Sequence, residues 1–196
     1  MELIVLRMKK RFLACAVLVI IFTLVTQTTL AYFSTASTAR NVITSGKVEV
    51  ELVEKTGEFD TEAELLALPE FKDLEGIVPG MDVSKIVFVR GAAGSADAWV
   101  RIKCDVTVAG FTAEQIGKAI SLDYDKNNWT EKDGYWYYNS PLKADQLTKP
   151  LFTTVTFTTE MGNEYQSCDV VITVQAEAVQ VANNGATALA AAGWTE

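Results

Sequence analysis

The sequence predicts an all-β protein, an antiparallel β-sandwich with two short helices behind an N-terminal signal helix. Residues 47–52 and 98–108 alternate apolar and polar side chains, which is typical of strands with one buried face. Aromatic residues surround Asp133-Gly134, a dipeptide that favours tight β-hairpins. Short strands with turn residues between them, roughly seven or eight in all, favour two packed antiparallel sheets.

Length and composition fit one exported domain. The chain has 196 residues, of which 49% are apolar, and its formal net charge is −8. An acidic surface repels nucleic acid and anionic lipid, so neither is expected as a partner. The chain contains no histidine, which removes the commonest metal ligand and acid–base catalyst.

Residues 1–31 read as a cleavable signal peptide. Four basic residues, Arg7, Lys9, Lys10 and Arg11, precede an apolar run at residues 12–25 that is too short to span a bilayer comfortably. Small residues at Thr29 and Ala31 predict cleavage between Ala31 and Tyr32. An uncleaved membrane anchor is the alternative, and the membrane is expected as a partner only through the uncleaved signal.

The first half of the expected mature chain contains two strands and a helix. Residues 32–46 are small, polar and β-prone, which suits either a linker or a strand that awaits a partner. The sandwich domain is expected over residues 47–182. After the strand at 47–52, residues 60–68 predict a helix with Asp60 as its cap and Pro69 as its stop. Residues 83–89 are apolar on both faces, which indicates a central strand.

The second half supplies the remaining strands. Residues 98–108 place Val100, Ile102, Cys104, Val106 and Val108 on one face, and Trp99, Arg101 and Lys103 on the other. Residues 112–119 predict a helix, because Thr112 and Gln115 have the spacing of a capping box. A hairpin follows at residues 127–138, then strands at 153–159 and 168–179, and a C-terminal tail at 183–196.

The expected chemistry of these residues is sparse. Cys104 and Cys168 occupy inward positions of long strands in an exported chain, so they form either a disulfide or two separate buried thiols. Residues 123–134 begin like a calcium loop but lack the required Gly and Glu, which favours a solvated turn and no metal or other cofactor. No nucleophile–base motif is present, so no catalytic residue and no enzymatic activity are expected.

The aromatic hairpin suggests two interpretations. Trp129, Tyr135, Trp136 and Tyr137 gather around one turn and could stack against a glycan. Cross-strand packing inside the protein is the commoner use of such residues.

The chain resembles the TasA/camelysin family, whose members are exported through a SipW-type signal peptidase. The matching motifs are short, and they run in order along nearly the whole sequence: Ala31-Tyr32-Phe33-Ser34, residues 41–48, Pro79-Gly80, residues 98–102, residues 133–138, Pro141-Leu142, residues 148–152 and residues 176–180. The resemblance implies a jelly-roll sandwich, cleavage at Ala31/Tyr32, and location at the bacterial cell surface or in an extracellular biofilm matrix.

The resemblance also implies self-assembly into fibres. The donor would be residues 32–44, with Tyr32, Phe33, Val42 and Ile43 as its apolar anchors, inserted as a strand into the next copy. The expected partners are another copy of the chain, a SipW-type signal peptidase and sibling matrix proteins. A monomeric module that binds a glycan or protein ligand is the alternative. The peptidase activity described for camelysin-like members is not expected here, because this sequence lacks histidine and any zinc-ligand cluster.

Overall fold

The computed structural model describes residues 48–196 apart from residues 75, 166–167 and 196. The chain divides into two units, residues 1–39 and residues 40–196, and every described residue belongs to the second. The predicted signal peptide, the Ala31/Tyr32 cleavage site and the proposed donor residues Tyr32, Phe33, Val42 and Ile43 lie outside the described residues.

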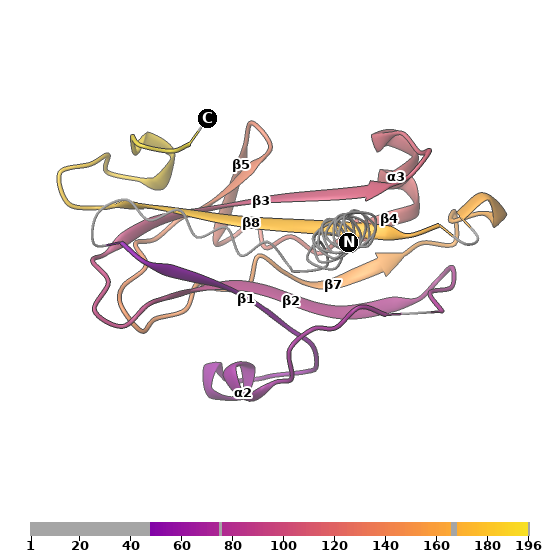
Figure 1. Ribbon diagram of the computed structural model, residues 1–196, viewed down its shortest axis with the longest axis horizontal. Helices are drawn as coiled ribbons and strands as arrows, with labels where there is room; N and C mark the ends of the chain where they lie inside the picture. Colours follow the sequence, from indigo (N-terminus) through magenta and orange to yellow (C-terminus); the bar gives the residue numbers. More distant parts are fainter. Residues whose placement is uncertain (1–47, 75, 166–167, 196) are drawn as a thin grey trace, which may run out of the picture. The chain divides into compact units, whose positions relative to one another are not determined.

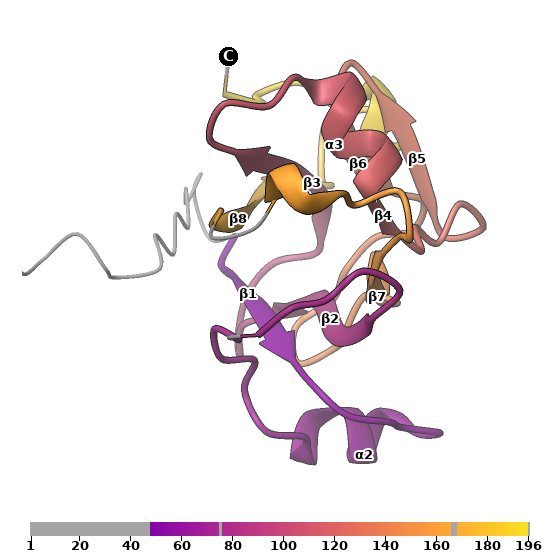
Figure 2. The ribbon, with the colours of Figure 1, turned by 90° about the vertical axis from the view of Figure 1, so that its right-hand side faces the viewer.

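The described residues form two four-stranded antiparallel sheets, which lie as two layers (Figures 1 and 2). The first sheet has the order β1 (Val50–Lys55), β2 (Asp82–Gly91), β7 (Phe152–Phe157), β4 (Ile120–Leu122). The second has the order β5 (Trp129–Lys132), β6 (Tyr135–Tyr138), β3 (Ala98–Val108), β8 (Val170–Gln180). The predicted all-β sandwich is confirmed, and β2 is central, as expected.

The pairing of the strands is that of a jelly roll. Strand β2 pairs with β7, and β3 pairs with β6, so early strands lie beside late ones in a nested order. Strand β1 also contacts β8 across the gap between the two sheets. This nesting is what results when one long antiparallel hairpin of eight strands is rolled into two sheets.

The longest ladder joins β3 to β8. All eleven residues of β3 are in register with β8, from Ala98 opposite Gln180 to Val108 opposite Val170. The predicted alternation of β3 is confirmed on its inner face, where Val100 and Ile102 are fully buried. The pattern predicts an outer face exposed to solvent, but Trp99 and Arg101 on that face are each only 5% exposed.

The two helices begin at capping boxes. In α2 (Glu62–Ala67) the cap is Thr61, whose side chain accepts a hydrogen bond from the Glu64 amide, so the prediction of Asp60 as the cap is wrong by one residue. In α3 (Ala113–Ala119) the predicted pair, Thr112 and Gln115, forms the box. Two short 3-10 helices, η1 (Asn163–Tyr165) and η2 (Ala188–Ala190), were not predicted.

The β5–β6 hairpin turns at the predicted dipeptide. Asp133 has φ of 54° and Gly134 has φ of 78°, the two positive values that a type I′ turn requires. Aspartate tolerates this region because its short polar side chain can hydrogen-bond to the nearby backbone, and glycine has no side chain to crowd it.

Apolar side chains fill three layers. The main core lies between the sheets, and α3 closes one end of it with Ile116 and Ala119. A second cluster packs Leu65 of α2 against the outer face of β2, at Ile86 and Phe88. A third lies on the outer face of the other sheet. Within the described residues no helix is long and apolar enough to cross a membrane.

The fold predicts a contrast between two apolar truncations. Ile102→Ala removes a fully buried side chain between the sheets and should lower the free energy of unfolding by about 2–5 kcal/mol. Leu66→Ala on α2 removes a side chain that is 41% exposed, and it should change that free energy by less than about 0.5 kcal/mol. Urea denaturation of the chain without residues 1–31 measures both, and equal losses would contradict the assigned core.

Candidate functional site: an apolar groove at the open seam

The two sheets are not closed along the whole seam between β2 and β8. Strand β1 pairs only with the second half of β2, from Ile86 to Gly91, and then turns away at Lys55. The first half of β2, including Val83, therefore has no β1 beside it. Instead the chain returns at Glu70, which bridges to Lys55, and continues across the opening.

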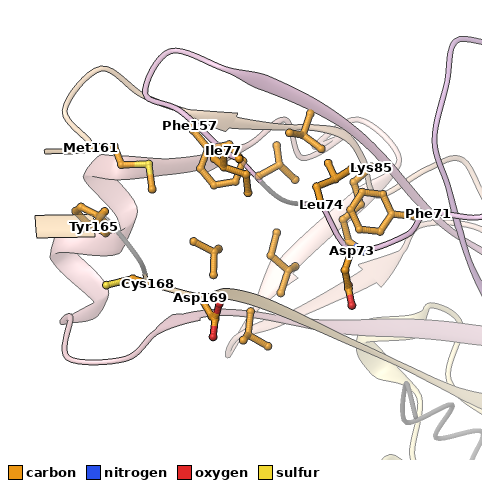
Figure 3. A pocket seen from close by; sticks show the side chains of 16 residues that line it. Phe71, Asp73, Leu74, Ile77, Lys85, Phe157, Met161, Tyr165, Cys168 and Asp169 are labelled. Carbon is orange, nitrogen blue, oxygen red and sulfur yellow. The ribbon is translucent and has the colours of Figure 1, made fainter. Parts of the chain in front are cut away.

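A groove of about 970 Å³ occupies this opening (Figure 3). Its floor is made by inward-facing residues of β2 and β7, one wall by the segment that follows α2, and the other by the start of β8. The lining residues are Phe71, Asp73, Leu74, Gly76, Ile77, Val83, Lys85, Val155, Phe157, Met161, Tyr165, Cys168, Asp169, Val170, Val171 and Ile172. Ten of these sixteen side chains are aliphatic, methionine or phenylalanine, so the groove suits an apolar occupant.

Exposed apolar side chains gather at the mouth of the groove. Leu74, on one wall, is 47% exposed. Val171, 50% exposed, belongs to the start of β8 in the other wall, where it alternates with the inward-facing Val170 and Ile172. Val78, just beyond the first wall, is 56% exposed. Large apolar side chains that share a concave surface mark a site of protein or ligand contact more often than isolated ones do.

The wall formed by β8 includes a strand edge that no other strand of the described part of the chain pairs with. Strand β8 is the last strand of its sheet, so among the described strands only β3 pairs with it. Its residues Val170–Ile172 line the groove. An extended peptide that lay there could therefore bond to the β8 backbone and place alternate side chains into the groove.

A buried ion pair between Lys85 and Glu54 contributes to the lining of the groove. Lys85 is 4% exposed and belongs to the same inward series as Val83 and Val87. Its Nζ donates to Glu54 Oε2 at 2.7 Å and lies 3.9 Å from the centre of the Phe71 ring. The lysine charge is thus neutralised within the protein.

Of the two alternatives for the cysteines, the disulfide is not formed. Cys104 and Cys168 are not bonded to each other, so the structure agrees with the alternative of two separate thiols. Cys104 lies beside Tyr124, and burial raises the pKa of its thiol from 9.0 to about 11. Burial likewise raises the pKa of Tyr124. Cys168 lines the groove, and its Sγ donates to the Glu164 carbonyl at 3.6 Å.

The hairpin aromatics are used for packing. Trp129 is 1% exposed and donates from its indole nitrogen to the Lys149 carbonyl at 3.0 Å. Trp136 faces the core and stacks on Tyr124 with ring centres 4.3 Å apart. Neither ring offers a face for a glycan. The proposed stacking site does not form, because the two tryptophans of the predicted set are buried.

Tyr135 and Tyr137 lie on the outer face of the sheet, around a buried arginine. Arg101 is opposite Tyr137 on β6 and opposite Glu177 on β8. Its guanidinium donates to Glu177 Oε2 at 2.7 and 2.9 Å and stacks over Tyr135 at 3.8 Å. This cross-strand ion pair and stack explain why an arginine is tolerated at a buried position.

The C-terminal tail covers that arginine. The Asn184 side chain bonds to the backbone of Gln180, Gly185 and Ala192, which fixes a loop over the sheet. Trp99 donates to the Gly185 carbonyl at 3.0 Å. Trp194 then meets Tyr137 edge-on and lies 4.9 Å from the Arg101 guanidinium. The sequence predicts only a tail at residues 183–196. Its signs of packing are Thr187, which caps a short turn, and Trp194 near the end of the chain.

The calcium-like loop is held by hydrogen bonds. Asp123 accepts from the backbone amides of Thr153 and Thr154 at 2.8 and 2.7 Å. Asp125 accepts from the amides of Asn127 and Asn128. Both carboxylates therefore stabilise the local backbone. Across the part of the chain that the structure describes, no three histidine, cysteine or acidic side chains are grouped so as to hold a metal ion.

Comparison with known proteins returned no match: no protein-family model, no curated protein and no solved structure is similar to this chain.

The raised thiol pKa predicts slow labelling of Cys104. In a Cys168→Ser chain without residues 1–31, Cys104 is the remaining cysteine, and its thiolate should form only as the pH approaches 11. Alkylation of the folded protein at pH 8 should be at least about tenfold slower than in denaturant, because the thiolate is the reactive form. Since the folded state holds this proton up to a higher pH, stability should fall as the pH rises above 9.

Thiol titration of the unmodified mature chain, unfolded without reductant, should find two reactive thiols, because Cys104 and Cys168 are not bonded to each other. The absence of any reactive thiol would contradict the structure and restore the disulfide.

The packed tail predicts a second effect on stability. Trp194→Ala removes the edge contact to Tyr137 and the ring beside Arg101, and it should lower the free energy of unfolding by about 1–2 kcal/mol. Leu189→Ala, in the same tail but 40% exposed, is the matched control and should have a smaller effect. Urea denaturation followed by circular dichroism measures both. A Trp194→Ala chain as stable as the control would show that the tail is not packed on the sheet.

Proposed function

We propose that the chain is an exported structural subunit of a bacterial extracellular matrix fibre, assembled through the segment at residues 32–44. The observation that supports this most directly is the apolar groove beside the edge of β8 that no described strand pairs with. A strand of another copy would bond to the β8 backbone and bury its apolar side chains against Val83 and Val155.

The described domain begins at the end of the sandwich away from the groove. The arm enters the described domain just before β1, whose first residue, Val50, lies opposite Gly91 at the end of β2. The groove is lined by Val83 and Lys85 in the first half of β2. Exit point and groove therefore lie towards opposite ends of the sandwich. An arm from one end that fills a groove at the other end of the next copy makes a head-to-tail contact, which extends into a filament when it does not close into a ring.

The arm has the composition that the groove requires. Residues 32–44 are rich in threonine, serine and β-branched residues, and they contain apolar side chains at Tyr32, Phe33, Val42 and Ile43. A stretch of this length spans roughly 40 Å when extended, which is longer than the lining part of β8. Release of this arm by a signal peptidase would couple assembly to export.

The proposal places the protein outside the cell and assigns it no catalysis. Its partners would be other copies of the chain, a SipW-type signal peptidase and sibling matrix proteins. A monomeric glycan-binding module is less well supported, since Trp129 and Trp136 are buried.

Deletion of the arm tests this function. The chain that begins at Tyr32 should form fibres visible by negative-stain electron microscopy, and the chain that lacks residues 32–44 should remain monomeric. Loss of assembly is expected because the arm supplies both the backbone partner of β8 and the apolar side chains for the groove.

A substituted arm supplies the matched control. Val42→Ser with Ile43→Ser should also prevent fibres, whereas Thr35→Ser with Thr38→Ser should leave them intact. Equal assembly by all four chains would rule out the arm as the donor.

A further inference from the structure

The groove carries an excess of negative charge. Among the described residues that line it, the charged ones are Lys85, Asp73 and Asp169. Lys85 is neutralised by Glu54, at 2.7 Å. Asp73 and Asp169 are exposed, and neither forms a hydrogen bond or ion pair with another described residue. Two uncompensated carboxylates therefore remain at the groove.

The two carboxylates belong to opposite walls. Asp73 lies in the segment between α2 and β2, two residues after Phe71, and Asp169 immediately precedes β8 (Figure 3). The apolar floor lies between these walls. A strand that entered the groove would therefore pass between two negative charges.

The arm carries the opposite charge. Arg40 is the only charged side chain in residues 32–44, and the segment has no acidic residue. Cleavage after Ala31 would add a positive α-amino group at Tyr32. The rest of the mature chain is acidic: without residues 1–31 it contains 13 basic and 24 acidic residues, a net charge of −11. Two copies repel each other overall, so local attraction between arm and groove would have to guide their association.

We infer that Asp73 and Asp169 are specificity-determining residues of the groove, which select an incoming strand with a basic residue at the position of Arg40. This inference rests on the proposed function and adds to it the feature by which the groove recognises its occupant. Apolar burial and backbone bonding would supply most of the affinity. Charges at the rim of an interface chiefly set the association rate and reject like-charged partners.

The selection also fixes which segments the groove refuses. The alternating residues 47–52 carry Lys47, Glu49 and Glu51 on their polar face, which gives that face a net charge of −1. Like charges across an interface are unfavourable. The carboxylates thereby favour the arm over other strand-forming segments of the same chain.

Charge reversal tests the inference on the chain that begins at Tyr32. Arg40→Glu alone, and Asp73→Lys with Asp169→Lys, should each slow fibre formation by about tenfold, because each places like charges together at the rim. The triple variant restores opposite charges and should assemble within about threefold of the unmodified chain. Light scattering gives the rates, and electron microscopy verifies the fibres.

Matched controls separate charge from folding. Glu58→Lys with Asp97→Lys makes the same change of net charge at two exposed residues outside the groove lining, and it should not slow assembly. The thermal unfolding of every variant should match that of the unmodified chain. A control that slowed assembly as much as the groove variant would show an effect of net charge alone.

The outcomes distinguish this inference from the function on which it rests. If fibres depend on residues 32–44 but the triple variant stays as slow as its parents, the charge selection is wrong and the fibre proposal stands. If deletion of the arm leaves assembly unchanged, or the unmodified chain never assembles, both proposals fail.

Discussion

The groove of this sandwich exists because β1 ends before it reaches the first half of β2. A β-sandwich buries the inner faces of its two sheets, and every inner side chain needs a cover. Strand β1 covers the inner layer as far as Glu54 and then leaves the sheet, so β2 continues past it with Val83 facing an opening. The segment after α2 covers this opening only in part, since Leu74 in that segment remains 47% exposed.

An ion pair and two hydrogen bonds stabilise the chain at the margin of that opening. Lys85 and Glu54 place an ion pair where the apolar layer stops, and Phe71 covers the ammonium group. Ser84 exchanges hydrogen bonds with the backbone of Gly57, which holds the turn after β1 against β2. These contacts hold the sheet edge in place beside the groove. The open seam is thus a built feature of the fold, and the proposed function gives it an occupant.

On the outer face of the β5–β6–β3–β8 sheet, the chain covers an apolar surface completely. There Trp99, Tyr137 and Val179 also form an apolar surface on the outside of a sheet, but the C-terminal tail covers it with Ala188 and Trp194. Arg101 is held beneath by Glu177 and by the tail backbone. This face is closed by the chain itself, whereas the seam between β2 and β8 is not closed by any described segment.

The sequence predicted the positions of the strands better than it predicted which of their faces other segments would cover. Alternation placed β3 correctly to the residue, because period-two patterning reports directly on a strand. It could not show that Trp99 and Arg101 would be covered, since the cover comes from residues some 86 to 94 positions later. The three-residue β4 was missed because so short a strand carries no pattern. The groove was invisible for the same reason: it depends on where β1 stops relative to β2, which is a property of register.

The most direct measurement of the central claim is a disulfide cross-link between arm and groove. One copy of the mature chain would carry Val42→Cys and another Val171→Cys, with Cys104 and Cys168 replaced by serine in both. Under mild oxidation of the mixture, the account predicts a covalent dimer of the two kinds of copy. If both cysteines are instead placed in one chain and form an internal bond at high dilution, with no cross-linked dimer from the mixture, the arm fills its own groove and the polymer account is contradicted.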